Sequence, residues 1–217
     1  IPTALSTDHL REATLEALLT CNIVRAIVDG PNARLYWEHS PDRIIIARAA
    51  RPTDSPEALR AAFVAGRFQV LAEFAPQYFG ISPADSSLAS IWDLAAELDI
   101  PVGIHMGIGP PGAVHLGSPN YRMVAGDPLL LEEVLARHPD LRLYVMHAGW
   151  PMLDRMIALM HAYPRVHVDL AVLNWYLPDA EFYTYFERLV GAGFSKRIMF
   201  GTDQMQWPGA NMIRLEN

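Results

Sequence analysis

The sequence lacks several features that would place the protein in a specialised class. It has a single cysteine, Cys21, so no internal disulfide can form, which is typical of a protein in a reducing compartment. No apolar run reaches the roughly 18 uncharged residues of a membrane span, and the first residues lack the charged and then apolar pattern of a signal peptide. We therefore predict a cytoplasmic protein that has no membrane partner.

Basic charge is also scarce. The chain has 17 Lys and Arg against 24 Asp and Glu, a net charge of −7, and the two signs are interspersed. Without a basic stripe or patch, the chain lacks the electrostatic footprint of a nucleic-acid-binding protein, so a small-molecule ligand is expected instead. With 217 residues, of which 51% are hydrophobic, residues 1–217 are predicted to form a single domain with its own core.

Short runs of apolar and β-branched residues recur along the chain, separated by stretches with helical spacing. Strict alternation of strand and helix with short connections predicts parallel strands, in either a closed (β/α)8 barrel or an open doubly wound sheet. The predicted strands cover residues 23–28, 43–47, 69–74, 102–105, 141–147, 166–170 and 197–201, and the clearest helices cover 87–99, 127–140 and 150–164.

Four of these strands deliver a polar side chain at the same relative place. Glu73, His105, His147 and Asp203 end or directly follow the runs "QVLAEF", "VGIH", "LYVMH" and "IMFGTD". The carboxyl ends of parallel strands meet at one edge, and carboxylates and imidazoles bind divalent metals from several directions at roughly 2 Å. Any one of the four could be a hydrogen-bonded loop residue, and a structural role at the rim is as good a reading for Glu73. Together they predict a metal site.

Aromatic and basic residues gather in the connections that follow strands. This placement predicts an aromatic-lined pocket in which an arginine holds a substrate carboxylate, although the same residues could cap the barrel or be ordinary solvated charges. The arginines in such connections are Arg34, Arg48, Arg51 and Arg122. The predicted substrate-binding residues are Trp150, Trp175, Trp207, Arg122 and His115.

Four stretches, "DIPVGIHMG" (99–107), "HPDLRLYVMHAGWP" (138–151), "RVHVDLAV" (165–172) and "RIMFGTDQMQWP" (197–208), resemble the amidohydrolase superfamily. The resemblance is to its amidohydrolase-related group of metal-dependent hydrolases and acid decarboxylases, and it covers nearly the whole chain. It implies a distorted (β/α)8 barrel with His105 and Asp203 as metal ligands. It also implies that His147 is a second-site ligand or the base that deprotonates the metal-bound water, that Glu73 occupies a ligand position on strand four, and that the protein is a homo-oligomer.

The chain departs from the family pattern at the first strand. In the family, this strand carries a His-x-His pair of metal ligands. No such pair exists among the histidines, which stand at positions 9, 39, 105, 115, 138, 147, 161 and 167. The chain also begins with a predicted helix, "STDHLREATLEALLTC", and ends at "NMIRLEN" in what is predicted to be a helix. We therefore expect a barrel that lacks its first strand and its C-terminal helices, truncated at both ends, with a metal site that is empty or partly occupied.

The leading prediction for function is hydrolysis of an ester, lactone or amide bond in a small carboxylate-bearing or aromatic substrate by a metal-bound hydroxide. His147 and Asp203 would act as the catalytic groups that take and relay the proton. Zinc is the expected ion, although the same ligands also accept manganese, iron or nickel. The first alternative is metal-dependent decarboxylation of an unsaturated or aromatic acid. The second is an inactive barrel that serves as a binding protein.

Overall fold

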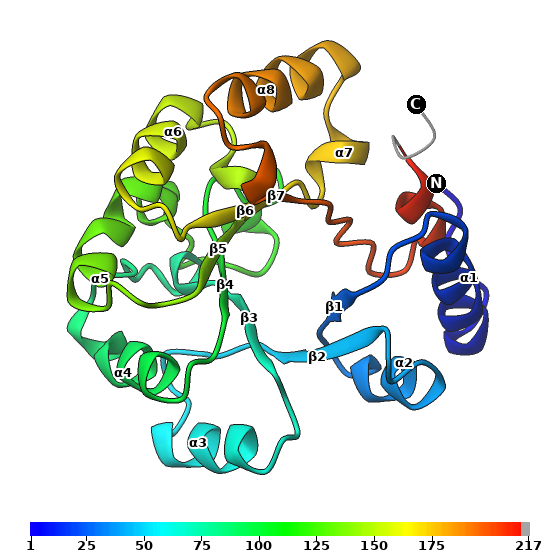
Figure 1. Ribbon diagram of the computed structural model, residues 1–217, viewed down its shortest axis with the longest axis horizontal. Coiled ribbons are helices and arrows are strands. Elements are labelled where there is room, and N and C mark those ends of the chain that lie inside the picture. Colours follow the sequence, from blue (N-terminus) through cyan, green and yellow to red (C-terminus); the bar gives the residue numbers. More distant parts are fainter. Residues whose placement is uncertain (214–217) are drawn as a thin grey trace.

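The computed structural model describes residues 1–213, which form a curved sheet of seven parallel strands with helices on its outer face (Figure 1). The strands follow one another in sequence order from β1 to β7. This order confirms the barrel-type α/β prediction and rules out the doubly wound sheet, in which the strand order reverses.

The strands are β1 (Ala26–Val28), β2 (Ile44–Arg48), β3 (Val70–Phe74), β4 (Val102–His105), β5 (Leu143–Met146), β6 (His167–Asp169) and β7 (Ile198–Met199). The α-helices are α1 (Thr7–Thr20), α2 (Ala33–His39), α3 (Pro56–Val64), α4 (Ala89–Glu97), α5 (Glu132–Arg137), α6 (Leu153–Ala162), α7 (Leu173–Tyr176) and α8 (Asp179–Gly191). The short 3-10 helices are η1 (Pro76–Phe79), η2 (Ser86–Leu88), η3 (Ala113–His115), η4 (Met123–Gly126), η5 (Pro128–Leu131), η6 (His147–Gly149), η7 (Ser195–Arg197) and η8 (Pro208–Met212).

Helix starts follow local capping chemistry. The Ser6 hydroxyl accepts the backbone N–H of His9 at the start of α1, and the Ser55 hydroxyl accepts that of Ala58 at the start of α3. The predicted helix over 127–140 begins instead with the 3-10 turn η5, in which the Asp127 carboxylate accepts the N–H of Leu129. None of the described helices combines the length and the hydrophobicity needed to cross a bilayer.

The alternation in β4 shows how the sheet separates two apolar layers. Val102 and Ile104 belong to the main core between sheet and helices, so Gly103 and His105 face the barrel interior. A Cβ atom on Gly103 would lie 2.2 Å from the Tyr144 ring, so glycine leaves the room that Tyr144 needs. Tyr144 packs in a buried cluster that fills the interior beneath the strand ends, with Ala47, Val70 and Ala72.

The sheet does not close, because β1 and β7 form no ladder with each other within residues 1–213. The segment after β7 instead reaches α1, where the N–H of Ala4 donates to the Gln206 carbonyl at 2.9 Å and the packing of η8 on α1 spans the gap (Figure 1). Ile27, paired in register with Ile45 of the interior cluster, is 40% exposed at this edge. The seven-stranded partial barrel is thus confirmed. Of the predicted terminal helix, residues 214–217 lie outside the described part of the chain.

Candidate metal centre

Three side chains from neighbouring strands converge at the carboxyl end of the sheet. Glu73 of β3, His105 at the end of β4 and His147 directly after β5 bring one ligand atom each within 4.8 Å of one another. Glu73 Oε1 is 3.7 Å from His105 Nε2 and 3.9 Å from His147 Nε2. Ligand atoms that share a tetrahedral ion at about 2.1 Å lie about 3.4 Å apart. A small contraction therefore fits these three groups to one divalent cation.

The His147 ring is held in one orientation. Its backbone N–H donates to Asp169 Oδ1 at 2.9 Å, and the same oxygen accepts the N–H of Ala171 at 3.0 Å. The Ala171 carbonyl lies 3.0 Å from His147 Nδ1 and can only accept, so Nδ1 carries a proton and donates it. The Nε2 atom is thereby left to face Glu73, which is the arrangement that orients a metal-binding histidine.

Charge within the cluster is unevenly distributed. Burial opposes a charge on His147, but its close contact with the Glu73 carboxylate and the negative charges of Asp169 and Glu73 outweigh burial and raise its pKa to about 9. Burial and the positive charge of His147 lower the pKa of His105 to about 3. Burial would raise the pKa of Glu73, but its contacts with the two histidines lower it overall. Without a cation, neutral pH thus leaves His105 ready to coordinate, whereas His147 must first lose a proton.

Tyr78 is a fourth member of this site, which the sequence places only among the aromatic residues expected to line the pocket. Its hydroxyl lies 3.4 Å from His105 Nε2, and the two rings meet edge to face with centroids 5.1 Å apart. Burial and the charge of Glu73 raise the pKa of Tyr78, so its hydroxyl stays protonated at neutral pH. Tyr78 lies in η1, four residues beyond the end of β3, so its contact with His105 does not follow from strand-end position.

Asp203 lies at the same end of the sheet but outside the group of three close ligand atoms. Burial and the negative charge of Glu73 raise its pKa to about 6, with smaller contributions in the same direction from Asp169 and Asp29. Asp169 ends β6 and Asp29 directly follows β1, so the strand-end signal that found Glu73 would have found both. A ligand role for Asp203 stays a prediction.

The three predicted substrate-binding tryptophans occupy two environments. Trp175 and Trp207 form an aromatic pair with centroids 5.7 Å apart, and the indole N–H of Trp175 donates to the carbonyl of Thr202, next to Asp203. Trp150 packs against the main core, and its indole N–H donates to Glu181 of α8 at 3.0 Å. The pair thus lies beside the rim, whereas Trp150 is held by the helical layer.

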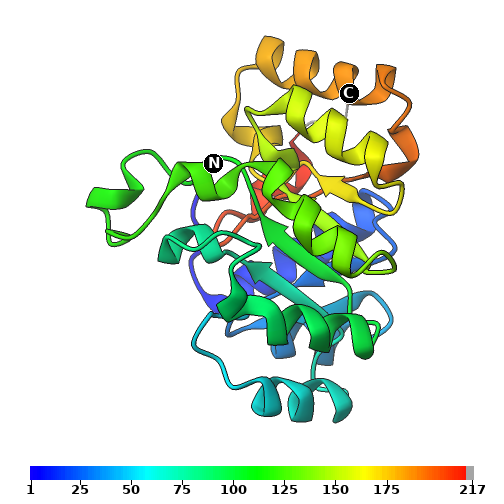
Figure 2. The same ribbon diagram turned by 90° about the vertical axis from the view of Figure 1, so that its left-hand side faces the viewer.

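His115 and Arg122 belong to the long segment between β4 and α5, which projects from the body of the molecule, in green at the left of Figure 2. His115 is exposed in η3. The Arg122 guanidinium donates to the carbonyls of Pro119 and Tyr121 in its own loop. The structure does not bring either residue into the cluster, and contact with substrate stays a prediction for both.

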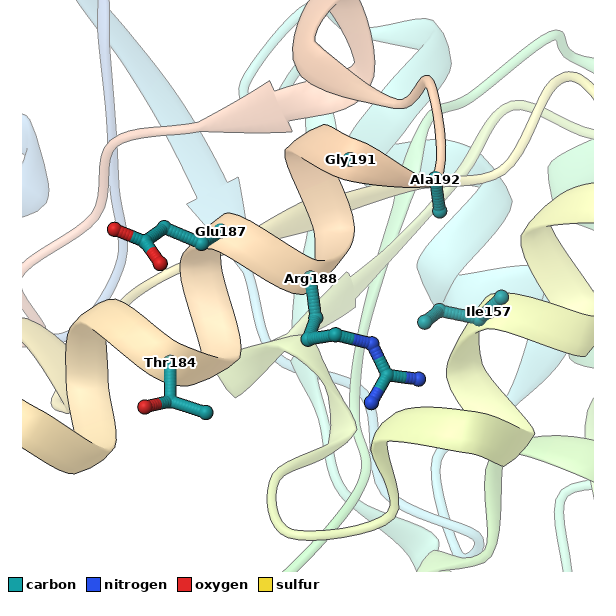
Figure 3. A pocket seen from close by; sticks show the side chains of 6 residues that line it. All are labelled: Ile157, Thr184, Glu187, Arg188, Gly191 and Ala192. Atoms are coloured by element: carbon teal, nitrogen blue, oxygen red, sulfur yellow. The ribbon is translucent and has the colours of Figure 1, made fainter.

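A separate groove of about 530 Å³ lies on the outer face between α6 and α8 (Figure 3). Its lining includes Ile157 of α6 and Arg188 of α8, and it contains no member of the cluster. Arg188 also pairs with Asp154 at 2.9 Å. This groove is therefore no extension of the candidate metal centre.

Fold and site together define an α/β-barrel protein with a candidate metal centre at the carboxyl ends of its strands. The chain belongs to the amidohydrolase family, because the family model described as "Amidohydrolase" matches residues 15–216. This confirms the resemblance that the strand-end motifs carry. No curated protein sequence matches the chain significantly.

Solved structures share the fold at low identity. An uncharacterised TIM-barrel protein from Bordetella bronchiseptica is 16% identical, with a TM-score of 0.71 over 97% of this chain and 73% of that one. A probable 2-pyrone-4,6-dicarboxylic acid hydrolase from Acinetobacter baumannii, with citric acid bound, is 12% identical, with a TM-score of 0.62 over 95% and 78%. A 5-carboxyvanillate decarboxylase from Novosphingobium aromaticivorans, complexed with manganese and a nitrobenzoic acid, is 17% identical, with a TM-score of 0.59 over 98% and 68%. Both hydrolases and decarboxylases thus share this barrel.

Proposed function

We propose that this protein is a metal-dependent hydrolase that opens an ester, lactone or amide bond in a small carboxylate-bearing or aromatic molecule. The observation that carries the proposal is the convergence of Glu73 Oε1 with the Nε2 atoms of His105 and His147. One carboxylate oxygen and two imidazole nitrogens are a ligand set that zinc accepts, and manganese and iron also accept it.

When bound, a divalent cation would polarise the scissile carbonyl and make water more acidic. Glu73, His105 and His147 would hold the ion, and Asp169 keeps the His147 ring aimed at it through the two backbone N–H groups that its Oδ1 accepts. Asp203, whose pKa is raised to about 6, is ionised at neutral pH and is the proposed acceptor of the proton of the attacking water. The protonated Tyr78 hydroxyl is placed to donate a hydrogen bond beside His105.

Decarboxylation of an aromatic acid is the second candidate. The decarboxylases that share the fold favour it, one of them complexed with manganese and an aromatic acid. The aromatic pair Trp175–Trp207 next to Asp203 would suit a flat substrate of that kind. Hydrolysis and decarboxylation would use the same ion, so the choice between them depends on pocket residues.

A parallel assay separates the candidates. The full chain is freed of metal with a chelator, reloaded with zinc or manganese, and offered a lactone (2-pyrone-4,6-dicarboxylate) and an aromatic acid (5-carboxyvanillate). We expect metal-dependent opening of the lactone without release of CO2, and loss of this activity in His105→Ala. Metal-dependent CO2 release from the aromatic acid would select decarboxylation instead. Binding of either compound without any turnover would select a binding protein.

A further inference from the structure

A second hollow, of about 350 Å³, lies directly beside the cluster. Its walls are the side chains of Arg51, Tyr78 and Phe79 and the loop residues 117–120. This volume is within the range of small-molecule sites. We call it the Arg51 pocket. It shares Tyr78 with the cluster, since the same ring that lines the pocket places its hydroxyl 3.4 Å from His105 Nε2.

The loop that forms one wall is held in place by close contacts. The backbone N–H of Arg122 donates to the Gln77 carbonyl at 3.0 Å. A Cβ atom on Gly80 would lie 2.8 Å from the carbonyl oxygen of Asn120, and one on Gly109 would lie 2.7 Å from the Tyr78 hydroxyl. Two glycines thus let the chain pack tightly around Tyr78, and the pocket wall has a defined position.

Arg51 supplies the only positive charge among the residues that line this pocket. Within residues 1–213, the structure pairs its guanidinium with no carboxylate, whereas the nearby Arg48 pairs with Asp54 at 3.4 Å. Asp54 also accepts the backbone N–H of Arg51 at 3.1 Å, which fixes the start of the Arg51 side chain. A guanidinium with unused donors, in a pocket that is also lined by Tyr78 and the half-exposed Phe79, suits a planar anion on an apolar body.

We propose that the Arg51 pocket binds a carboxylate of the substrate. Arg51 holds the carboxylate in bidentate fashion, and Tyr78 and Phe79 contact the ring or chain that carries it. The molecule then reaches past Tyr78 toward Glu73, His105 and His147. This last step rests on the proposed function, whereas the binding step does not.

The test is calorimetric titration of the metal-free full chain with benzene-1,3-dicarboxylate, a flat dianion. We expect the dianion to bind, and Arg51→Gln to weaken binding at least about tenfold because it removes a charged bidentate contact. Arg67→Gln removes another exposed arginine, outside the pocket, and should leave the affinity unchanged. Benzene-1,3-dicarboxamide, the neutral analogue, should bind the wild-type protein at least about tenfold more weakly than the dianion.

Three results would overturn the proposal: no binding of the dianion to the wild-type protein, equal affinities for Arg51→Gln and wild type, or equal affinities for dianion and diamide. Because the titration needs neither metal nor turnover, its outcome is independent of the enzymatic assay. Loss of binding in Arg51→Gln by a protein that turns nothing over would leave the pocket assignment standing and remove the proposed function. Turnover by the wild-type protein, together with unchanged dianion binding in Arg51→Gln, would remove the pocket assignment and leave the proposed function standing.

Discussion

The middle of the sheet and its two edges both carry ionisable side chains but hold them differently. Glu73, His105 and His147 come from strands with a hydrogen-bonded neighbour on each side, and both histidines are buried. Asp29 follows edge strand β1 and Asp203 follows edge strand β7. The middle strands bring ligand atoms within 4.8 Å of each other, whereas the edge carboxylates stay outside that group.

The difference shows what a continuous ladder contributes to a site. Four register pairs join β4 to β5, from Val102↔Leu143 to His105↔Met146, so the positions of His105 and His147 along the barrel axis are fixed relative to each other. Strand β7 has two residues, and the chain beyond it is held through loop contacts such as that of Gln206 with Ala4. Edge groups therefore influence the centre through charge, as the pKa of Asp203 shows, more than through contact.

The largest effect, a loss of turnover, is expected from mutation of His147 in the middle of the sheet. His147→Asn removes Nε2, and asparagine tolerates the left-handed backbone that this position requires (φ 57°). We expect turnover to fall at least about 100-fold. The far-UV circular dichroism should not change. His161→Asn, on the exposed end of α6, is the matched control and should retain full turnover. Near-normal turnover in His147→Asn would return His147 to a structural role.

The second largest effect is expected at Asp169, which accepts the backbone N–H of His147. Asp169→Ala leaves the backbone N–H groups of His147 and Ala171 without their acceptor, so we expect the free energy of unfolding to fall by about 2–4 kcal/mol in urea titrations. Asp169→Asn keeps an acceptor oxygen and should lose far less. Equal losses in the two variants would mean that the charge of Asp169, and not its role as acceptor, stabilises the turn.

Mutation of the edge residue Asp203 should raise the stability of the fold, whereas mutation of Asp169 should lower it. Burial and Glu73 raise the pKa of Asp203 to about 6 in the folded chain from 3.8, so ionised Asp203 destabilises the fold above pH 6. Asp203→Asn should raise the free energy of unfolding by about 1–3 kcal/mol at pH 7.5 and lower turnover. The gain should shrink as the pH falls through 6 and vanish below about 3.8, where both states are protonated. A gain that is independent of pH would exclude this electrostatic origin.

The smallest effect is expected at Trp150. Its indole N–H bonds to Glu181 in the helical layer, so Trp150→Phe should cost about 1 kcal/mol of stability. Turnover and metal affinity should stay at the wild-type level. A large rise in KM with unchanged stability would instead place the indole against the substrate, as the sequence predicts.

Much of the fold and part of the site are predictable from sequence for the same physical reason. Strand alternation and strand-end polarity are local signals, and they identify all seven strands as well as Glu73, His105 and His147. Tyr78 is not predictable in this way, because it reaches His105 through the backbone path of η1 and not through strand register.

The tryptophans and Asp203 show the other limit of sequence. A residue that follows a strand can turn to the rim, as Trp175 does beside Thr202, or to the helical layer, as Trp150 does toward Glu181. The direction is set by partners distant in sequence. The separation of Asp203 from the cluster likewise depends on where β7 ends and how the following segment packs on α1, which no local pattern encodes.

Titration of the metal-free full chain with zinc tests the central claim, that Glu73, His105 and His147 form one cation site, most directly. Calorimetry should show one zinc ion per chain, with affinity at least about tenfold weaker in Glu73→Gln and in His105→Ala, and with affinity that rises from pH 7 to 9 as His147 loses its proton. The claim would be contradicted if the wild-type chain bound no zinc, or if both variants bound zinc with the affinity of the wild type.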